Sequence, residues 1–264
     1  MFTLGRKIDL RYKPNLIIVL ASLIAVAAGW LMFGEFSLGI SLGGGFFLTW
    51  VFSRELDPAH DYSAYLAAVL SLSMLVDFES IGFLNALWLV LHMRAVNGIT
   101  GKSLTLFDVL ALMGLTVFLS LNDENSIYLL LFVFAMILIR QTRAKTKVAS
   151  IAGFLAFLLF TLQSTLMGTL SLNQLDYSNL FNLLMIVVPC LSLIPLWFLS
   201  RIKTEDDKGN RVAQSQVFAS QLLYNVAVLL LFFFSDISFS DQMIYLSANI
   251  GVVLHFLILK SKIK

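Results

Sequence analysis

The sequence predicts an all-α integral membrane protein, a polytopic bundle of about ten transmembrane helices with both termini in the cytoplasm. Hydrophobic residues make up 59% of the 264 residues and charged residues only 13%, whereas a soluble domain carries about 25% charged residues. Apolar segments recur along nearly the whole chain, most of them close to the roughly 20 residues that cross a bilayer core. We therefore expect residues 1–264 to form a single polytopic transmembrane domain.

Short polar gaps divide the apolar sequence into ten expected spans. The first of these is too long for the apolar core of a signal peptide, which has about 7 to 15 residues, so it predicts an uncleaved helix. The expected spans are residues 15–33, 36–52, 62–76, 81–96, 104–121, 126–139, 148–171, 180–199, 213–234 and 242–259.

Local patterns predict how several of these helices begin and pack. Residues 1–14 alternate apolar and basic side chains, which is typical of a short interfacial helix on the lipid bilayer. Gly39 and Gly43 are four apart in the second span, so another helix can approach there closely. Thr105-x-x-Asp108 and Ser238-x-x-Asp241 have the spacing of capping boxes at the fifth and tenth spans.

The eighth span contains Pro189 and Pro195. Proline frees backbone carbonyls inside a helix, and interrupted helices of this kind often form transporter binding sites. A tolerated kink, with Ser192 bonded to a freed carbonyl, is the structural alternative. The polar gap 201–211 that follows is expected to be a solvated turn closed by Gly209.

The distribution of charge predicts the orientation. If the chain crosses the membrane ten times, all 18 Lys and Arg residues fall on one side. The only charged residues in the loops on the other side are acidic, from Glu35 to Asp241. Because positively charged loops stay in the cytoplasm, the basic side is expected to be cytoplasmic in a plasma (inner) membrane. Removing or adding one span in the middle would mix the two sets of loops.

Other classes of protein are disfavoured. The single cysteine, Cys190, allows no intramolecular disulfide and no thiolate metal site. The basic residues are scattered over short loops, so no nucleic-acid partner is expected. No Asp, Glu, Lys or Arg lies at the centre of a span, which disfavours a proton relay or an ion pump. No feature of the sequence indicates an oligomeric state.

Polar residues inside the spans are the first set of candidate site residues. Each costs free energy in lipid unless it faces other helices or a cavity. They are expected either to form interhelical hydrogen bonds, worth about 1 kcal/mol each, or to line a substrate cavity. These residues are Asn85, His92, Gln221, Asn225, Asn249 and His255.

The loop 53–62 holds the second set. Its acids Glu55, Asp57 and Asp61, with His60 beside them, could bind a divalent metal such as magnesium, which would in turn hold a pyrophosphate. The structural alternative is that Asp57 caps the next helix, with Pro58 as the first helical residue. The acids of Glu205-Asp206-Asp207 lie on the same predicted side and could share such a cation.

Two families resemble parts of this pattern. Ten short-looped spans resemble the layout of drug/metabolite-type transporters, which implies binding or transport of a small organic or lipidic molecule and no cofactor. The position of Asp57-x-x-x-Asp61 after the second span resembles that of an aspartate motif in intramembrane prenyltransferases. That second likeness implies a lipid-modifying enzyme with magnesium, although the family also has a second aspartate motif. A non-catalytic membrane assembly subunit is the third possibility.

Reporter fusions test the predicted topology. Fusions in the basic loops should report the cytoplasm, and fusions in the acidic loops should report the outside, because Lys and Arg resist translocation. The cytoplasmic positions follow residues 57, 100, 144, 207 and 264, and the outside positions follow residues 78, 124, 176 and 238. A reproducible inversion in the middle of the chain would contradict the ten-span topology.

Overall fold

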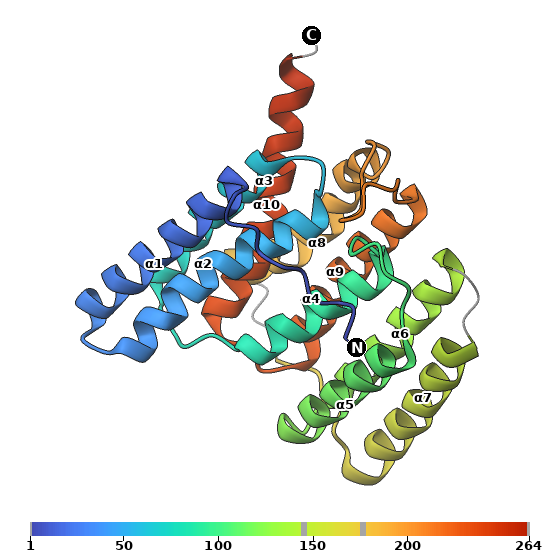
Figure 1. Ribbon diagram of the computed structural model, residues 1–264. Coiled ribbons are helices and arrows are strands. Elements are labelled where there is room, and N and C mark those ends of the chain that lie inside the picture. The colour runs from blue at the N-terminus through green and yellow to red at the C-terminus, as the bar shows by residue number, and fades with distance from the viewer. Residues whose placement is uncertain (1, 144–146, 175–177, 263–264) are drawn as a thin grey trace. The chain divides into compact units, whose positions relative to one another are not determined.

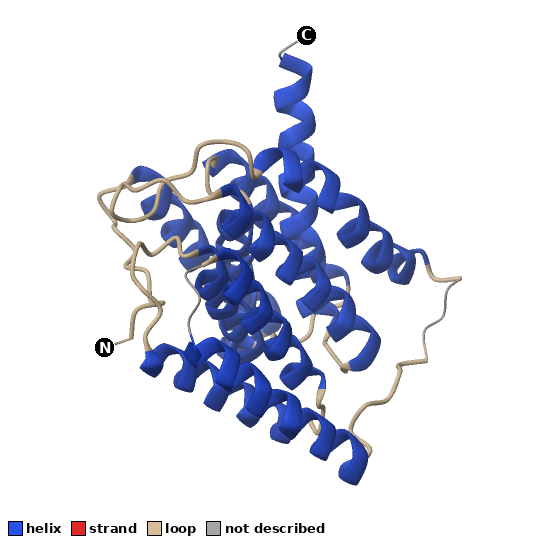
Figure 2. Cartoon of the chain, turned by 90° about the vertical axis from the view of Figure 1, so that its right-hand side faces the viewer, coloured by secondary structure: helices blue, strands red, loops and turns tan. Residues whose placement is uncertain are grey.

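The computed structural model describes residues 2–143, 147–174 and 178–262. Over these residues the chain forms ten α-helices and one short 3₁₀ helix and contains no β-strand (Figure 2). Three residues of the charge pattern, Lys145, Asp176 and Lys264, lie outside the described residues. Helix lengths and composition are those of a multi-pass membrane protein.

Each of the ten expected spans is confirmed as a helix, with ends that differ by at most about one helical turn. The helices are α1 (Lys13–Phe33), α2 (Phe36–Leu56), α3 (Asp61–Ser71), η1 (Leu72–Val76), α4 (Phe83–Asn97), α5 (Leu106–Asn122), α6 (Ile127–Thr142), α7 (Lys147–Met167), α8 (Leu180–Leu199), α9 (Gln214–Phe234) and α10 (Phe239–Lys262). The prediction of an interfacial helix within residues 1–14 is wrong, because residues 2–12 are not helical.

Six of the described helices, namely α1, α2, α7, α8, α9 and α10, are long and apolar enough to cross a membrane. The other α-helices are shorter. For example, α4 has 15 residues, which at about 1.5 Å per residue gives roughly 22 Å, less than the bilayer core. The helices therefore support a multi-pass protein, and the ten-span topology stays a prediction.

The chain divides into two compact units, each assembled from segments far apart in the sequence. The α6 unit comprises residues 1–6, 87–183 and 200–236, and so contains most of α4 together with α5, α6, α7 and α9. The α2 unit comprises residues 7–86, 184–199 and 237–264, and contains α1, α2, α3, most of α8, and α10. Each unit is described by itself.

In the α2 unit, α2 packs against α1, α3 and α10 (Figure 1). A Cβ added at Gly43 would lie 2.5 Å from the carbonyl oxygen of Ser22, and one added at Gly39 would lie 2.6 Å from that of Val26. The prediction that both glycines face another helix is confirmed, and that helix is α1. Only glycine permits this backbone-to-backbone approach.

In the α6 unit, a buried apolar core is built from α4, α5, α6, α7 and α9, and Leu4 of the N-terminal segment joins it. Leu4 is held there because the Thr3 amide donates a hydrogen bond to Asp108 Oδ1 at 2.7 Å. Asp108 and Thr105 form the predicted capping box of α5. The non-helical N-terminal segment is thus fixed by burial and by the α5 cap.

Local hydrogen bonds confirm two further predictions in the α2 unit. The Asp241 amide donates to Ser238 Oγ at 3.1 Å, so Ser238 caps α10, and the Asp241 carboxylate also accepts from the Gly82 amide. Inside α8, Ser192 Oγ lies 2.9 Å from the carbonyl oxygen of Pro189. The α8 helix therefore continues through both of its prolines.

The contact at Gly43 predicts the effect of a large side chain there. Gly43→Leu should sharply lower the folded yield in detergent, because α1 must move away, and overpacking of this kind costs about 1–3 kcal/mol or more. Gly114→Leu is the matched control, since a Cβ at Gly114 in α5 meets nothing within 4 Å. Gly34 is not suitable, because its φ of +75° disfavours any side chain. Equal monodisperse yields for the two variants would contradict the close packing of α1 on α2.

Candidate metal centre

The turn between α2 and α3 consists of residues 57–60. Asp57 ends α2, because its amide donates to the carbonyl oxygen of Ser53 at 2.8 Å. His60 precedes α3, and Ser63 Oγ donates to the His60 carbonyl oxygen at 2.9 Å. The prediction that Asp57 caps α3 with Pro58 as its first residue is wrong, since the helix begins at Asp61. The Asp57 carboxylate is free for another role.

That carboxylate lies between two imidazoles. His60 Nδ1 is 2.9 Å from Asp57 Oδ1 and 3.2 Å from Oδ2. His255 Nδ1, from α10, is 3.6 Å from Oδ2, and the two imidazole rings are 4.9 Å apart between centroids. Two residues of the turn and one residue of α10 therefore converge on one point.

Helix packing fixes the position of His255. On α10, Gly251 lies one turn before His255, and a Cβ added at Gly251 would lie 2.5 Å from the Ala67 amide nitrogen of α3. The rings of Phe52 and Tyr245 meet edge to face between α2 and α10, with centroids 5.5 Å apart. These contacts hold α10 against both helices that flank the turn.

Burial and charge make Asp57 the centre of the group. Its side chain is 1% exposed, whereas His60 is 24% exposed. Burial raises the pKa of the Asp57 carboxyl, but the nearby His255 and His60 imidazoles outweigh it and bring that pKa below its usual range. The bond to Asp57 raises the pKa of His60. Without a metal, Asp57 is thus an ionised carboxylate paired with His60.

His255 Nδ1 is buried and has no hydrogen-bond partner, since 3.6 Å exceeds hydrogen-bond length. A buried polar atom without a partner is uncommon in folded proteins. Coordination of a metal by this nitrogen would satisfy it.

The three side chains lie close enough together to hold a metal ion. Ligand atoms of Asp57, His60 and His255 all lie within 4.8 Å of one another. Zinc lies about 2.0–2.2 Å from such ligands, so tetrahedral neighbours are roughly 3.4 Å apart. The distances of 2.9 and 3.6 Å from Asp57 to the two imidazoles bracket that value. Two imidazoles and one carboxylate suit zinc, iron or manganese rather than magnesium, which prefers oxygen ligands.

The predicted acidic set is only partly in this group. Asp57 belongs to it. Asp61 instead pairs with Arg54 and accepts a hydrogen bond from the Tyr12 hydroxyl, and Glu55 is buried in the last turn of α2. The magnesium site of Glu55, Asp57 and Asp61 stays a prediction, but the structure engages one of its members elsewhere.

The six candidates for a substrate cavity divide between the two units. In the α6 unit, Asn225 Nδ2 donates to the Gln221 carbonyl oxygen at 2.8 Å, and His92 Nδ1 lies 2.8 Å from that of Trp88. In the α2 unit, Asn249 Oδ1 is 3.2 Å from Ser192 Oγ. This last contact joins two helices, α8 and α10, as expected. Asn85 is half-buried beside Gly82, and His255 belongs to the group around Asp57.

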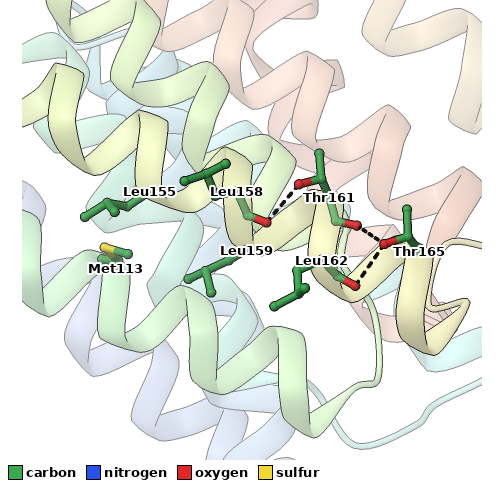
Figure 3. Close-up of a pocket in the computed structure, with 7 residues that line it drawn as sticks. All are labelled: Met113, Leu155, Leu158, Leu159, Thr161, Leu162 and Thr165. Atoms are coloured by element: carbon green, nitrogen blue, oxygen red, sulfur yellow. Dashed lines mark hydrogen bonds between the residues drawn. The ribbon is translucent and has the colours of Figure 1, made fainter.

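A pocket of about 590 Å³ lies between α5 and α7 (Figure 3). Met113 and four leucines form most of its lining. The hydroxyls of Thr161 and Thr165 donate to backbone carbonyls of their own helix, at 2.9 and 2.6 Å. The pocket therefore offers no free polar group for chemistry, and its lining includes none of the six cavity candidates.

Comparison of the chain with protein-family models, with curated proteins and with solved structures finds no match. Multi-pass membrane protein is the class that the helices define.

Proposed function

We propose that the protein is a membrane-embedded, metal-dependent enzyme that modifies a lipidic substrate. A divalent transition-metal ion would be bound by Asp57, His60 and His255. The observation that carries the proposal is a buried, ionised carboxylate between two imidazoles, one from the turn after α2 and one from α10.

Three protein ligands support a catalytic role. Catalytic zinc sites commonly keep three protein ligands and one open position, whereas structural sites have four. A metal bound in this way lowers the pKa of its water and polarises carbonyl or phosphoryl oxygens. Hydrolysis or transfer at an ester or phosphate group is therefore the reaction class that the donor set favours. The partly exposed His60 marks the side from which a substrate would approach.

A lipidic substrate is supported by the surroundings. An apolar pocket of about 400 Å³ lies between α8 and α10 in the same unit, lined by Val188, Leu191, Ile194 and others. Residues 253, 254, 256 and 257, on either side of His255, also line it. A hydrocarbon chain could occupy this pocket. The segregation of Lys and Arg supports a cytoplasmic position for that turn in a plasma (inner) membrane.

Binding or transport of a small organic or lipidic molecule is the second candidate. One observation favours it: Ser192 of α8 contacts Asn249 of α10 beside Pro189, so a polar pair lies next to a helix-internal proline, and transporter sites often use proline-containing helices. This function would need no metal. Magnesium would be the cofactor only if Glu55, Asp57 and Asp61 together bound the ion.

Metal titration tests the proposal. Chelator-stripped full-length protein in detergent should bind one zinc or manganese ion per chain by calorimetry. Asp57→Asn and His255→Gln should each weaken binding more than about 100-fold, since even a partner of a ligand contributes 10- to 100-fold. Asp61→Asn is the matched control, because this neighbouring carboxylate pairs with Arg54.

Two outcomes would change the assignment. If the folded wild type binds neither metal, the metal centre is wrong and the transport function takes precedence. If Asp61→Asn and Glu55→Gln abolish magnesium binding while His255→Gln leaves it intact, the acidic magnesium set is correct instead.

A further inference from the structure

A polar pocket of about 270 Å³ lies on the α6 unit and shares no residue with the metal centre. It is formed by the loop after α4, by Arg143 at the end of α6, and by the loop before α9. Three basic side chains, Lys102, Arg143 and Arg211, line it, and Asp206 is the one acid in its lining. All of these segments carry the basic residues of the predicted cytoplasmic side.

Two glycines shape this pocket. Gly98 and Gly101 have φ of +67° and +65°, a backbone conformation that side chains disfavour. A Cβ at Gly98 would lie 3.0 Å from Arg143 Nη2, and one at Gly101 would lie 2.7 Å from Asp206 Oδ2. The guanidinium and the carboxylate can approach the backbone only because both positions lack a side chain.

Arg143 is held in place by two backbone carbonyl oxygens. Its Nη1 donates to the Ala95 carbonyl oxygen at 2.7 Å, and its Nη2 donates to that of Lys102 at 3.0 Å. Burial lowers the pKa of Arg143, against the opposing influence of Asp108. No salt bridge of Lys102, Arg143 or Arg211 is found over residues 2–143, 147–174 and 178–262.

The one carboxylate in the lining, Asp206, offsets only one of the three positive charges. Its Oδ1 accepts from the amides of Lys208 and Asn210, both at 2.8 Å, and its Oδ2 accepts from Asn210 Nδ2 at 3.2 Å. The carboxylate is thus engaged in its own turn, and the lining keeps an excess of positive charge.

We propose that this pocket binds a phosphate-bearing anion, with Arg143 as a fixed donor and with Lys102 and Arg211 as mobile counter-charges. Guanidinium groups recognise phosphate oxygens through paired hydrogen bonds. A volume of 270 Å³ equals about nine water molecules at roughly 30 Å³ each, enough for a hydrated phosphate or diphosphate group. The group could belong to a soluble phosphate compound or to a lipid headgroup.

Binding assays on the full chain test this site. In one arm, sodium pyrophosphate is titrated into the detergent-solubilised protein. In the other arm, the protein is titrated with nanodiscs of phosphatidic acid in neutral lipid. The Lys102→Ala/Arg211→Ala double variant should raise the Kd at least tenfold. Lys203→Ala is the matched control, since Lys203 lies outside the pocket and pairs with Glu205, and its Kd should equal that of the wild type.

Arg143→Lys gives a second test, because it keeps the charge and loses the paired donors. The folded variant, isolated as the monodisperse fraction, should bind the probe more weakly than the wild type. Binding of pyrophosphate that is sensitive to the variants identifies a soluble phosphate ligand. Sensitive binding of phosphatidic acid alone identifies a lipid headgroup. Failure of the wild type to bind either probe, or equal binding by the double variant, overturns the proposal.

Discussion

The physical constraint on the α2 unit is the buried carboxylate of Asp57. A charge removed from water is costly unless it is paired, and here the pairing requires one side chain from the turn and one from a distant helix. His60 is supplied by the turn itself, while His255 reaches Asp57 because α10 packs closely on α3 at Gly251. The helix packing and the site geometry are thus parts of one arrangement.

The stability of the fold does not by itself require Asp57, His60 and His255 at this position. Replacing a buried charged group by apolar residues of similar volume often leaves a protein equally stable or makes it more stable. The 3.6 Å between His255 Nδ1 and Asp57 Oδ2 exceeds hydrogen-bond length, so this pairing offsets the burial of the imidazole nitrogen only in part. A bound metal would remove both costs, because it neutralises Asp57 and occupies the His255 nitrogen. That is why the site is better explained by ligand binding than by packing.

The sequence predicted the helices well, because apolar length and polar gaps are local properties. It also predicted the α5 cap and the glycine contact at Gly43, both of which depend on short spacings. The helix expected within residues 1–14 failed, because Leu4 is buried and Thr3 is bonded to the distant Asp108.

The proposed metal centre could be predicted only in part. The local Asp-Pro pattern indicated a cap, whereas Asp57 in fact closes α2 and faces two histidines. His255 was recognised as a polar residue in a span, but its partner is almost two hundred positions away along the chain. Nothing in the spacing around either residue signals that contact. The positive-φ glycines 98 and 101 were visible as turn residues, yet the pocket they form depends on Arg143 and Asp206 from other segments.

X-ray absorption spectroscopy of the metal-loaded protein tests the central claim most directly, because it reports the ligands of the ion. The wild type should show two imidazole nitrogens and oxygen ligands at about 2.0–2.2 Å from the metal, and His255→Gln should show one imidazole. A first shell made only of oxygen, with no imidazole scattering in the wild type, would contradict the assignment of Asp57, His60 and His255 as the metal centre.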